Sequence, residues 1–126
     1  MHGWQKLVVM GPEAVTGFLA SMGVPFPGVN ALLLIATELA GGAALLFGAF
    51  TRVAGILTAF AMLVATLLVH LPNGYFLPNG FEFTVTLLLA SVALSMTGAG
   101  AYSVDAALFA GGPLHRMAEG RLPRAA

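Results

Sequence analysis

A single glutamate interrupts a long apolar run, and it is the residue best placed to do chemistry. The run ALLLIATELAGGAALLFGAF fills residues 31 to 50, and Glu38 is its only acid. An ionisable side chain in a membrane-length apolar segment is costly to bury and by default marks a proton relay or a ligand site. Burial favours the neutral acid unless a cation or several hydrogen-bond donors lie nearby. We therefore expect Glu38 to face other helices and to handle a proton or a ligand.

Further polar residues gather toward one end of the apolar segments. His70 lies in the last turn of the second apolar segment, and Glu82 opens the third. His2 and Lys6 lie within the first ten residues. If the segments pack as a bundle, these four side chains converge with Glu38 on one pocket for a ligand or a proton in the outer leaflet.

Each of these residues also has a structural interpretation. Glu38 could be a hydrogen-bond partner of a neighbouring helix, and His70 could be a polar residue at the membrane interface. Glu82 stands at a helix N-terminus, where an acid complements the helix dipole. Lys6 could be an interfacial anchor. Histidine and carboxylate side chains are also metal ligands, but the scattered spacing and the lack of a His-x-x-x-His pair do not favour a metal site.

The composition indicates an integral membrane protein. Of 126 residues, 59% are hydrophobic and 8% are charged, and the mean hydropathy is +0.94. Soluble domains carry about 25% charged residues, so this chain has too little charge to cover a water-exposed surface. The absence of cysteine excludes disulfides, thiolate catalysis and cysteine-bound metal clusters within the chain. A net charge of zero with no basic block gives no indication of nucleic-acid binding.

Three apolar segments are predicted to cross the lipid bilayer as helices. They run from 30 to 50, from 53 to 71 and from about 83 to 96. About 20 helical residues span the ~30 Å hydrocarbon core, so the first two are long enough and the third is slightly short. Residues 1–10 resemble the last turns of another helix, and 13–22 form a helix too short to span. The predicted fold is all-α: an integral membrane helical bundle with three full transmembrane helices and an N-terminal stub of a fourth.

Turn residues separate the predicted helices. Thr51-Arg52 is predicted to form a very short turn, which makes the first two spans antiparallel neighbours. The repeated Leu-Pro-Asn-Gly within 71–80 favours two turns with positive φ. The Gly-Ala-Gly at 98–100 ends the third helix. Ser103 then caps a short interfacial helix from Val104 to Ala110.

Basic residues predict the orientation of the chain. Arg52 and the arginines of the C-terminal tail are separated by two spans, so they share one side, and the positive-inside rule places that side in the cytoplasm. The predicted domains are a transmembrane bundle over residues 1–110 and a polar, disordered, cytoplasmic tail over 111–126. The arginines that determine this topology are Arg52, Arg116, Arg121 and Arg124.

Six short features between His2 and Asp105 follow one another in the order seen in a known family. They are HGWQKL at 2–7, SMGVP at 21–25, ELAGG at 38–42, FGAFTR at 47–52, His70 and GAGAYSVD at 98–105. Together they resemble the DoxX family, small four-helix membrane proteins of bacteria. The resemblance implies a multi-pass protein of the bacterial cytoplasmic membrane whose first helix closes with His-Gly-x-x-Lys. Since the chain begins at that motif, we expect most of the first helix to be missing from this sequence.

The resemblance also implies a function. Members of the family are linked to quinone-dependent sulfur oxidation and to membrane oxidoreductase complexes that handle oxidative stress. We therefore expect a membrane subunit or anchor of a quinone-linked oxidoreductase, with no covalently bound cofactor, a quinone in the outer pocket and electrons from a soluble or membrane partner. Two alternatives stay open: a small proton-coupled transporter that uses Glu38, as in dimeric exporters, and a structural or assembly protein without a ligand. The chain has no catalytic motif of its own, so it is at most a subunit of an enzyme.

Overall fold

The computed structural model describes residues 2 to 109, and all regular structure in that range is helical. Helices satisfy every backbone polar group within one segment, which is what a chain this apolar needs inside lipid. The all-α prediction is confirmed for these residues, whereas the predicted tail over 111–126 lies outside them. The α-helices are α1 (His2–Trp4), α2 (Pro12–Ser21), α3 (Pro27–Ala36), α4 (Gly42–Phe47), α5 (Thr51–Ala65), α6 (Glu82–Thr97) and α7 (Val104–Phe109). Between them lie three π-helical segments, η1 (Gln5–Met10), η2 (Thr37–Gly41) and η3 (Thr66–His70), and one 3-10 turn, η4 (Leu71–Asn73).

Two of the predicted spans are long apolar helices. Pro27–Phe47 is continuous through α3, η2 and α4 and has 21 residues, and Thr51–Asn73 is continuous through α5, η3 and η4 and has 23. Both are long and apolar enough to cross a bilayer. The third predicted span is the apolar helix α6, whose 16 residues rise about 24 Å. Its crossing of the membrane therefore stays a prediction.

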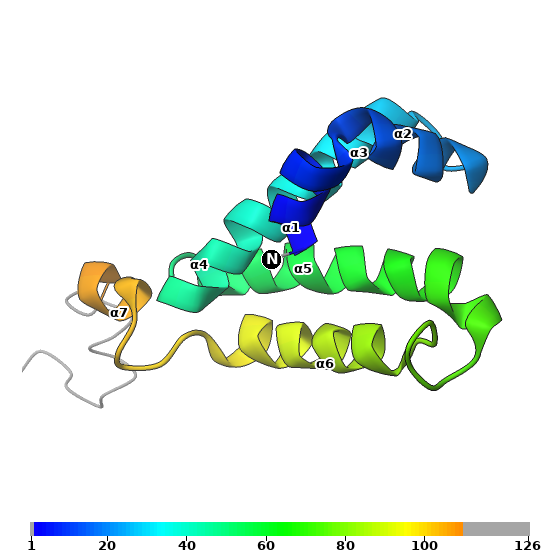
Figure 1. The fold of residues 1–126 in the computed structure, drawn as a ribbon. Coiled ribbons are helices and arrows are strands. Elements are labelled where there is room, and N and C mark those ends of the chain that lie inside the picture. The colour runs from blue at the N-terminus through cyan, green and yellow to red at the C-terminus, as the bar shows by residue number, and fades with distance from the viewer. Residues whose placement is uncertain (1, 110–126) are drawn as a thin grey trace, which may run out of the picture.

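Helices α5 and α6 lie side by side and antiparallel (Figure 1). Gly55 of α5 makes this possible, because a Cβ added there would lie 2.8 Å from the carbonyl oxygen of Ser91 and 3.0 Å from the backbone nitrogen of Ser95. Small residues at a helix interface let the two backbones approach closely. Ala54 and Ala59 are buried on the same helix. The pair is thus packed through small side chains.

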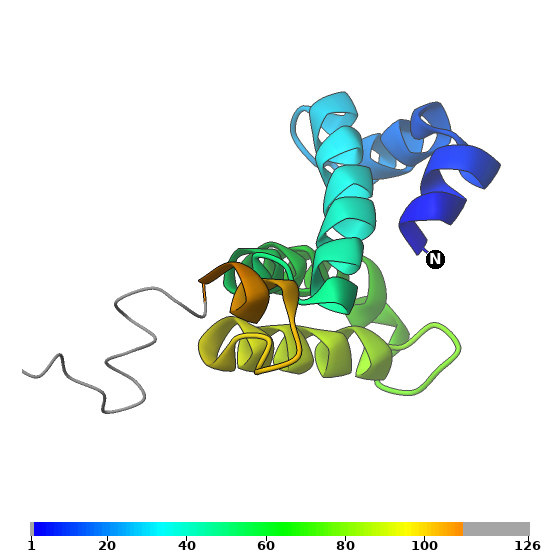
Figure 2. The same cartoon turned by 90° about the vertical axis from the view of Figure 1, so that its left-hand side faces the viewer.

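The N-terminal segments pack against α3, away from most of the α5–α6 pair. Helix α2 packs on α3 around a small core of Val15, Ala31 and Ile35. Figure 2 shows the rod formed by α3, η2 and α4 standing across the α5–α6 pair, with α1 and α2 beside it. The first long helix therefore joins the N-terminal segments to the rest of the bundle.

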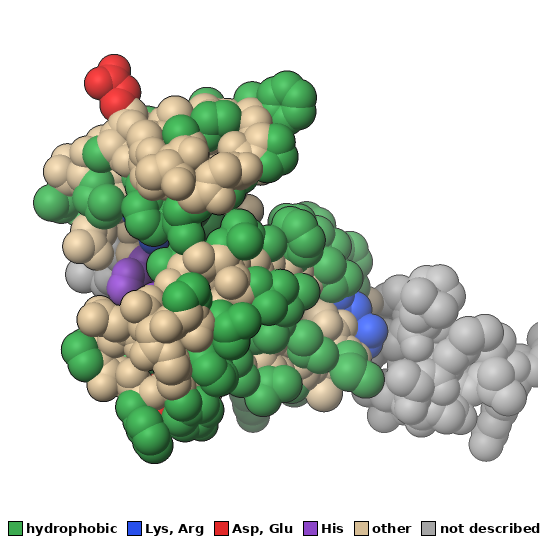
Figure 3. All heavy atoms as spheres, turned by 90° about the vertical axis from the view of Figure 1, so that its right-hand side faces the viewer, with side chains coloured by type: hydrophobic (Ala, Val, Ile, Leu, Met, Phe, Trp, Pro, Cys, Tyr) green, Lys and Arg blue, Asp and Glu red, His purple; other side chains and the backbone are tan. Residues whose placement is uncertain are grey.

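Large hydrophobic side chains cover the outer faces of the long helices (Figure 3). Leu46 is 80% exposed, Phe60 66% and Leu89 63%. Such contiguous apolar surface suits lipid and not water. The exposed apolar surface is thus consistent with the predicted membrane bundle.

The turn between the first two long helices differs from the prediction. It is formed by Gly48 to Phe50, with φ of +64° at Gly48 and +47° at Phe50, and Thr51 already belongs to α5. The prediction of a Thr51-Arg52 turn was wrong because a side chain from a distant part of the chain, Asp105, holds the first amides of α5.

The glycine turns were predicted with mixed success. Gly74 has a φ of +78°, as expected, whereas the second Leu-Pro-Asn-Gly forms a turn at 77–79 without the positive φ that was predicted at Gly80. Gly80 instead packs against the backbone of Tyr75 and Phe76. The prediction for 98–100 is confirmed, since Gly98 ends α6 with a φ of +80°.

The predicted cap of the last helix is also confirmed. The hydroxyl oxygen of Ser103 accepts a hydrogen bond from the backbone N–H of Ala106 at 3.0 Å. An N-cap of this kind satisfies one of the amides that a helix start leaves unpaired. It fixes the first turn of α7 beside the start of α5.

Candidate functional site

A bidentate ion pair joins the N-terminal segment to the first long helix. The Nζ of Lys6 lies 2.8 Å from both carboxylate oxygens of Glu38. The Lys6 side chain is 23% exposed and that of Glu38 is 12% exposed. The glutamate therefore faces η1 and is largely withdrawn from the surface, and the cation that its burial requires comes from 32 residues earlier in the chain.

Gly3 brings the two partners within reach. A Cβ added at Gly3 would lie 2.8 Å from the Cγ of Leu39 and 3.0 Å from the Cβ of Glu38. Any side chain at this position would push α1 away from η2. The glycine of the His-Gly-x-x-Lys motif is therefore explained by close contact, which places Lys6 over Glu38.

Three of the predicted site residues lie in π-helical segments. Lys6 is in η1, Glu38 in η2 and His70 in η3. A π-helical turn widens the helix and is found frequently at functional sites, since it redirects side chains at the cost of regular hydrogen bonding. Nothing in the sequence signalled these distortions. Their coincidence with the ionisable residues supports a role for this region beyond packing.

His70 and Glu82 both bind the loop that connects η4 to α6. The Nδ1 of His70 lies 2.9 Å from the backbone oxygen of Asn79, so Nδ1 carries the proton that this carbonyl accepts. Glu82 accepts a hydrogen bond from the backbone N–H of Leu77 at 2.9 Å. For neutral His70 this leaves Nε2 as an unprotonated acceptor. Glu82 acts as a clamp for the loop, which agrees with its structural interpretation.

His2 lies beside the start of α6. Its ring centroid is 6.4 Å from that of Phe83, the second residue of α6. Figure 3 shows histidine atoms in a hollow of the molecular surface, with a lysine or arginine side chain behind them. Among residues 2–109, no hydrogen bond joins the Lys6–Glu38 pair to His70 or Glu82. The predicted single pocket thus consists of a half-buried ion pair and a loop-binding pair, with His2 packed near the second.

A buried hydroxyl pair was not predicted. The Oγ1 atoms of Thr66 and Thr84 lie 2.8 Å apart, and both residues are buried. Thr66 also donates to the backbone oxygen of Met62, one turn earlier. This contact ties the first turn of η3, which carries His70, to α6.

Within the described range, no three histidine, cysteine, aspartate or glutamate side chains are grouped so that they could hold a metal ion.

At the opposite end of the bundle, Asp105 binds the start of α5. One carboxylate oxygen accepts the N–H of Phe50 at 2.6 Å, and the other accepts the N–H of Thr51 at 2.9 Å. The backbone N–H of Thr51 is the main cause that holds the pKa of Asp105 below its ordinary value of 3.8. The sequence position of Asp105, two residues after Ser103, indicates only an acid at the N-terminus of its own helix. The Asp105 side chain caps a helix that lies 54 residues away.

We expect the docking of α7 to depend on pH through Asp105. Because the folded pKa is lowered, the stabilisation is fully present above the unfolded value of 3.8 and is lost as the pH falls through the folded value. Hydrogen-exchange protection of the Phe50 and Thr51 amides should therefore drop at the acid end of a series from about pH 6 to pH 3. In Asp105→Asn the Phe50 and Thr51 amides should have low hydrogen-exchange protection at every pH of the series, without a pH-dependent drop. Equal protection in both proteins at pH 6 would contradict this role.

Comparison with known proteins agrees with the geometry. The DoxX family profile matches residues 1–71. The chain is 35% identical to the Bacillus subtilis (strain 168) protein named "Putative oxidoreductase CatD", over 88% of this chain and 78% of that protein. It is 35% identical to inner membrane protein YqjF of Escherichia coli (strain K12), over 82% of this chain and 77% of that protein, and 28% identical to inner membrane protein YphA of the same organism, over 83% and 78%. No solved structure matches the chain. The chain therefore belongs to the DoxX family and is a relative of bacterial inner membrane proteins.

Proposed function

We propose that this protein is a membrane subunit of a quinone-linked oxidoreductase system and that Lys6 and Glu38 form the contact site for the quinone headgroup. The ion pair carries the proposal. A bidentate lysine–glutamate pair, 23% and 12% exposed, lies in a region whose helices are otherwise apolar. Ionisable groups in such surroundings are by default functional. The name printed for the relative, "Putative oxidoreductase CatD", favours the same class of reaction.

The donors at the pair suit a quinone. A lysine ammonium has three N–H donors, and two of those of Lys6 bind Glu38. The third can donate to a quinone carbonyl oxygen, which has no proton of its own. The partial exposure of Lys6 leaves this side of the ammonium reachable. Leu7 follows Lys6 in η1 and Phe83 lies against the His2 ring, and both are exposed apolar side chains that the ring or its tail could contact.

Glu38 and His70 are the proposed proton carriers. Reduction of a quinone to a quinol takes two electrons and two protons; the electrons come from a partner oxidoreductase, since this chain carries no redox motif. The Glu38 carboxylate of the ion pair holds no proton, so it would first take one up from outside and then pass it to the carbonyl held by Lys6. His70 would pass protons from the loop end of the bundle through Nε2, because its Nδ1 is held by Asn79.

The proposed topology has three crossings, with α6 as the third and the Arg52 end in the cytoplasm. The loop that binds His70 then faces the outside. The start of α5 and α7 lie together at one end, so Arg52 and α7 share one side in this topology. Since the chain has no cysteine, single cysteines at Asn73 and Ala101 can be labelled in intact cells with a membrane-impermeant maleimide. Labelling at 73 alone is expected, and labelling at 101 alone would reverse the orientation.

The test is quinone retention by the purified full chain. Wild type extracted in mild detergent should retain endogenous quinone, and Glu38→Gln should lose most of it. His70→Ala should keep the quinone, because His70 binds the loop and lies outside the proposed headgroup contact. Glu13→Gln is the matched control, because Glu13 is an exposed acid on α2 away from the pair. Equal quinone in wild type and Glu38→Gln would refute the proposal. No quinone, combined with pH-dependent substrate flux that requires Glu38, would favour the transporter instead.

A further inference from the structure

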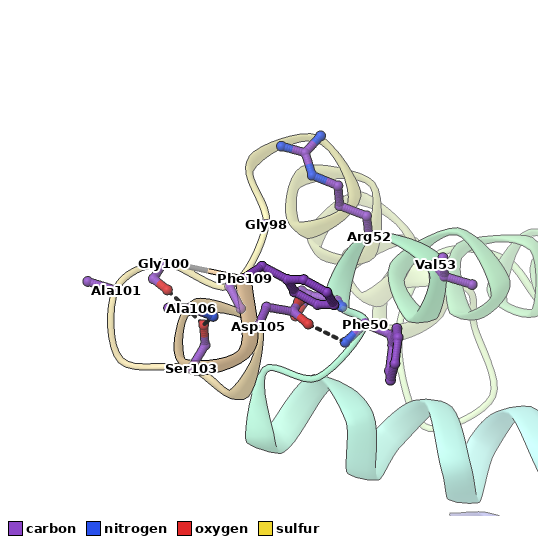
Figure 4. A pocket seen from close by; sticks show the side chains of 12 residues that line it. Phe50, Arg52, Val53, Gly98, Gly100, Ala101, Ser103, Asp105, Ala106 and Phe109 are labelled. Carbon is purple, nitrogen blue, oxygen red and sulfur yellow. Dashed lines mark hydrogen bonds between the residues drawn. The ribbon is translucent and has the colours of Figure 1, made fainter. Parts of the chain in front are cut away.

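The end of the bundle opposite the His70 loop contains a groove that the proposed function does not use. The groove has a volume of about 640 Å³ and lies where the start of α5, the end of α6 and α7 meet (Figure 4). It combines a cation with aromatic and aliphatic side chains. The lining residues used below are Phe50, Arg52, Val53, Asp105 and Phe109.

Arg52 supplies a positive charge without a partner in the described part of the chain. The residue is exposed, and among residues 2–109 no carboxylate lies within ion-pair distance of it. Figure 4 shows the guanidinium turned away from the Asp105 carboxylate. That carboxylate is bound to the backbone amides of Phe50 and Thr51. The cation at the rim is therefore available to an anion from outside.

Below the cation the groove is apolar. The rings of Phe50 and Phe109 lie edge to face with centroids 6.5 Å apart. They are 63% and 57% exposed, and Val53 is 58% exposed. A planar guanidinium suits a phosphate oxygen pair, and the apolar side chains suit a hydrocarbon chain. A ligand that fits both parts is anionic at one end and aliphatic at the other.

We propose that this groove binds an anionic phospholipid, with the phosphate on Arg52 and an acyl chain against Phe50, Val53 and Phe109. The position favours a lipid because the groove lies at the ends of two long apolar helices, where headgroups meet hydrocarbon. Basic pockets between membrane helices recognise anionic headgroups in this way. The lipid site shares no residue with the proposed quinone site, so failure of one proposal would leave the other unaffected.

Native mass spectrometry of the full chain tests the proposal. The protein is equilibrated in mixed micelles with equal amounts of dioleoylphosphatidylglycerol and dioleoylphosphatidylcholine. Wild type should retain phosphatidylglycerol preferentially, and Arg52→Gln should lower that preference about fivefold, the effect of one interfacial cation. Arg52→Lys should keep most of the preference, which guards against a folding defect in the glutamine variant. Phe109→Ala should lower retention of both lipids, whereas Phe60→Ala, which removes an exposed ring elsewhere on α5, should not.

Two results would overturn the site. One is an unchanged preference for phosphatidylglycerol in Arg52→Gln. The other is a dimer in the same spectra that disappears in Arg52→Gln, because a second copy of the chain would then occupy the groove.

Discussion

Replacing Lys6 with methionine is expected to lower the free energy of unfolding by about 3 to 5 kcal/mol, the largest effect we expect from one side chain. The substitution leaves the Glu38 carboxylate, 12% exposed, without its cation in apolar surroundings. Removing one partner of a buried pair costs far more than the pair itself contributes. Reversible unfolding in mixed detergent micelles with increasing sodium dodecyl sulfate measures the change.

The control is the double variant Lys6→Met with Glu38→Leu. Replacing a whole buried ion pair with apolar side chains is often neutral or stabilising, so the double variant should recover most of the loss. It should nevertheless fail to retain quinone, which separates the structural role of the pair from its proposed chemistry. A loss below about 0.5 kcal/mol in Lys6→Met alone, the range of ordinary surface substitutions, would mean that the pair is not buried in the membrane protein.

Gly55→Ala is expected to destabilise the protein by about 1 to 3 kcal/mol through the α5–α6 interface. The new Cβ would lie 2.8 Å from the carbonyl oxygen of Ser91 and 3.0 Å from the backbone nitrogen of Ser95. Backbone atoms cannot rotate away as a flexible side chain does, so the two helices must separate. The same detergent unfolding series measures the effect.

Gly42→Ala provides the matched control for Gly55→Ala. Gly42 is also helical, but a Cβ added there meets no atom within 4 Å. Alanine should therefore stabilise this position by up to about 1 kcal/mol through its helix propensity. If Gly55→Ala were as stable as Gly42→Ala, the close contact between α5 and α6 would be refuted.

The helices could be predicted from the sequence because apolar length and turn residues are local signals. The predicted segments 30–50, 53–71 and 83–96 correspond to Pro27–Phe47, Thr51–Asn73 and Glu82–Thr97. Errors occurred where distant residues decide the local structure. The start of α5 is set by Asp105, whose carboxylate lies 54 residues away from Thr51 in sequence.

The site could be predicted only in part. Glu38 was evident because an acid in an apolar run is conspicuous, and Lys6 was among its predicted neighbours. Their direct pairing could not be foreseen, because it depends on how Gly3 lets α1 approach η2. The three π-helical segments have no local sequence signal, and the Thr66–Thr84 contact depends on how η3 lies against α6.

Cysteine cross-linking in membranes tests most directly whether Lys6 lies on Glu38. The native chain has no cysteine, so Lys6→Cys combined with Glu38→Cys gives one defined pair. A short bifunctional thiol reagent should join the two positions, read as a linked peptide by mass spectrometry. The control combines Lys6→Cys with Leu46→Cys. It should give no link, because Leu46 lies about 12 Å from Glu38 along the same helix. Equal linking in both variants, or linking only to position 46, would contradict the ion pair on which the proposed site is built.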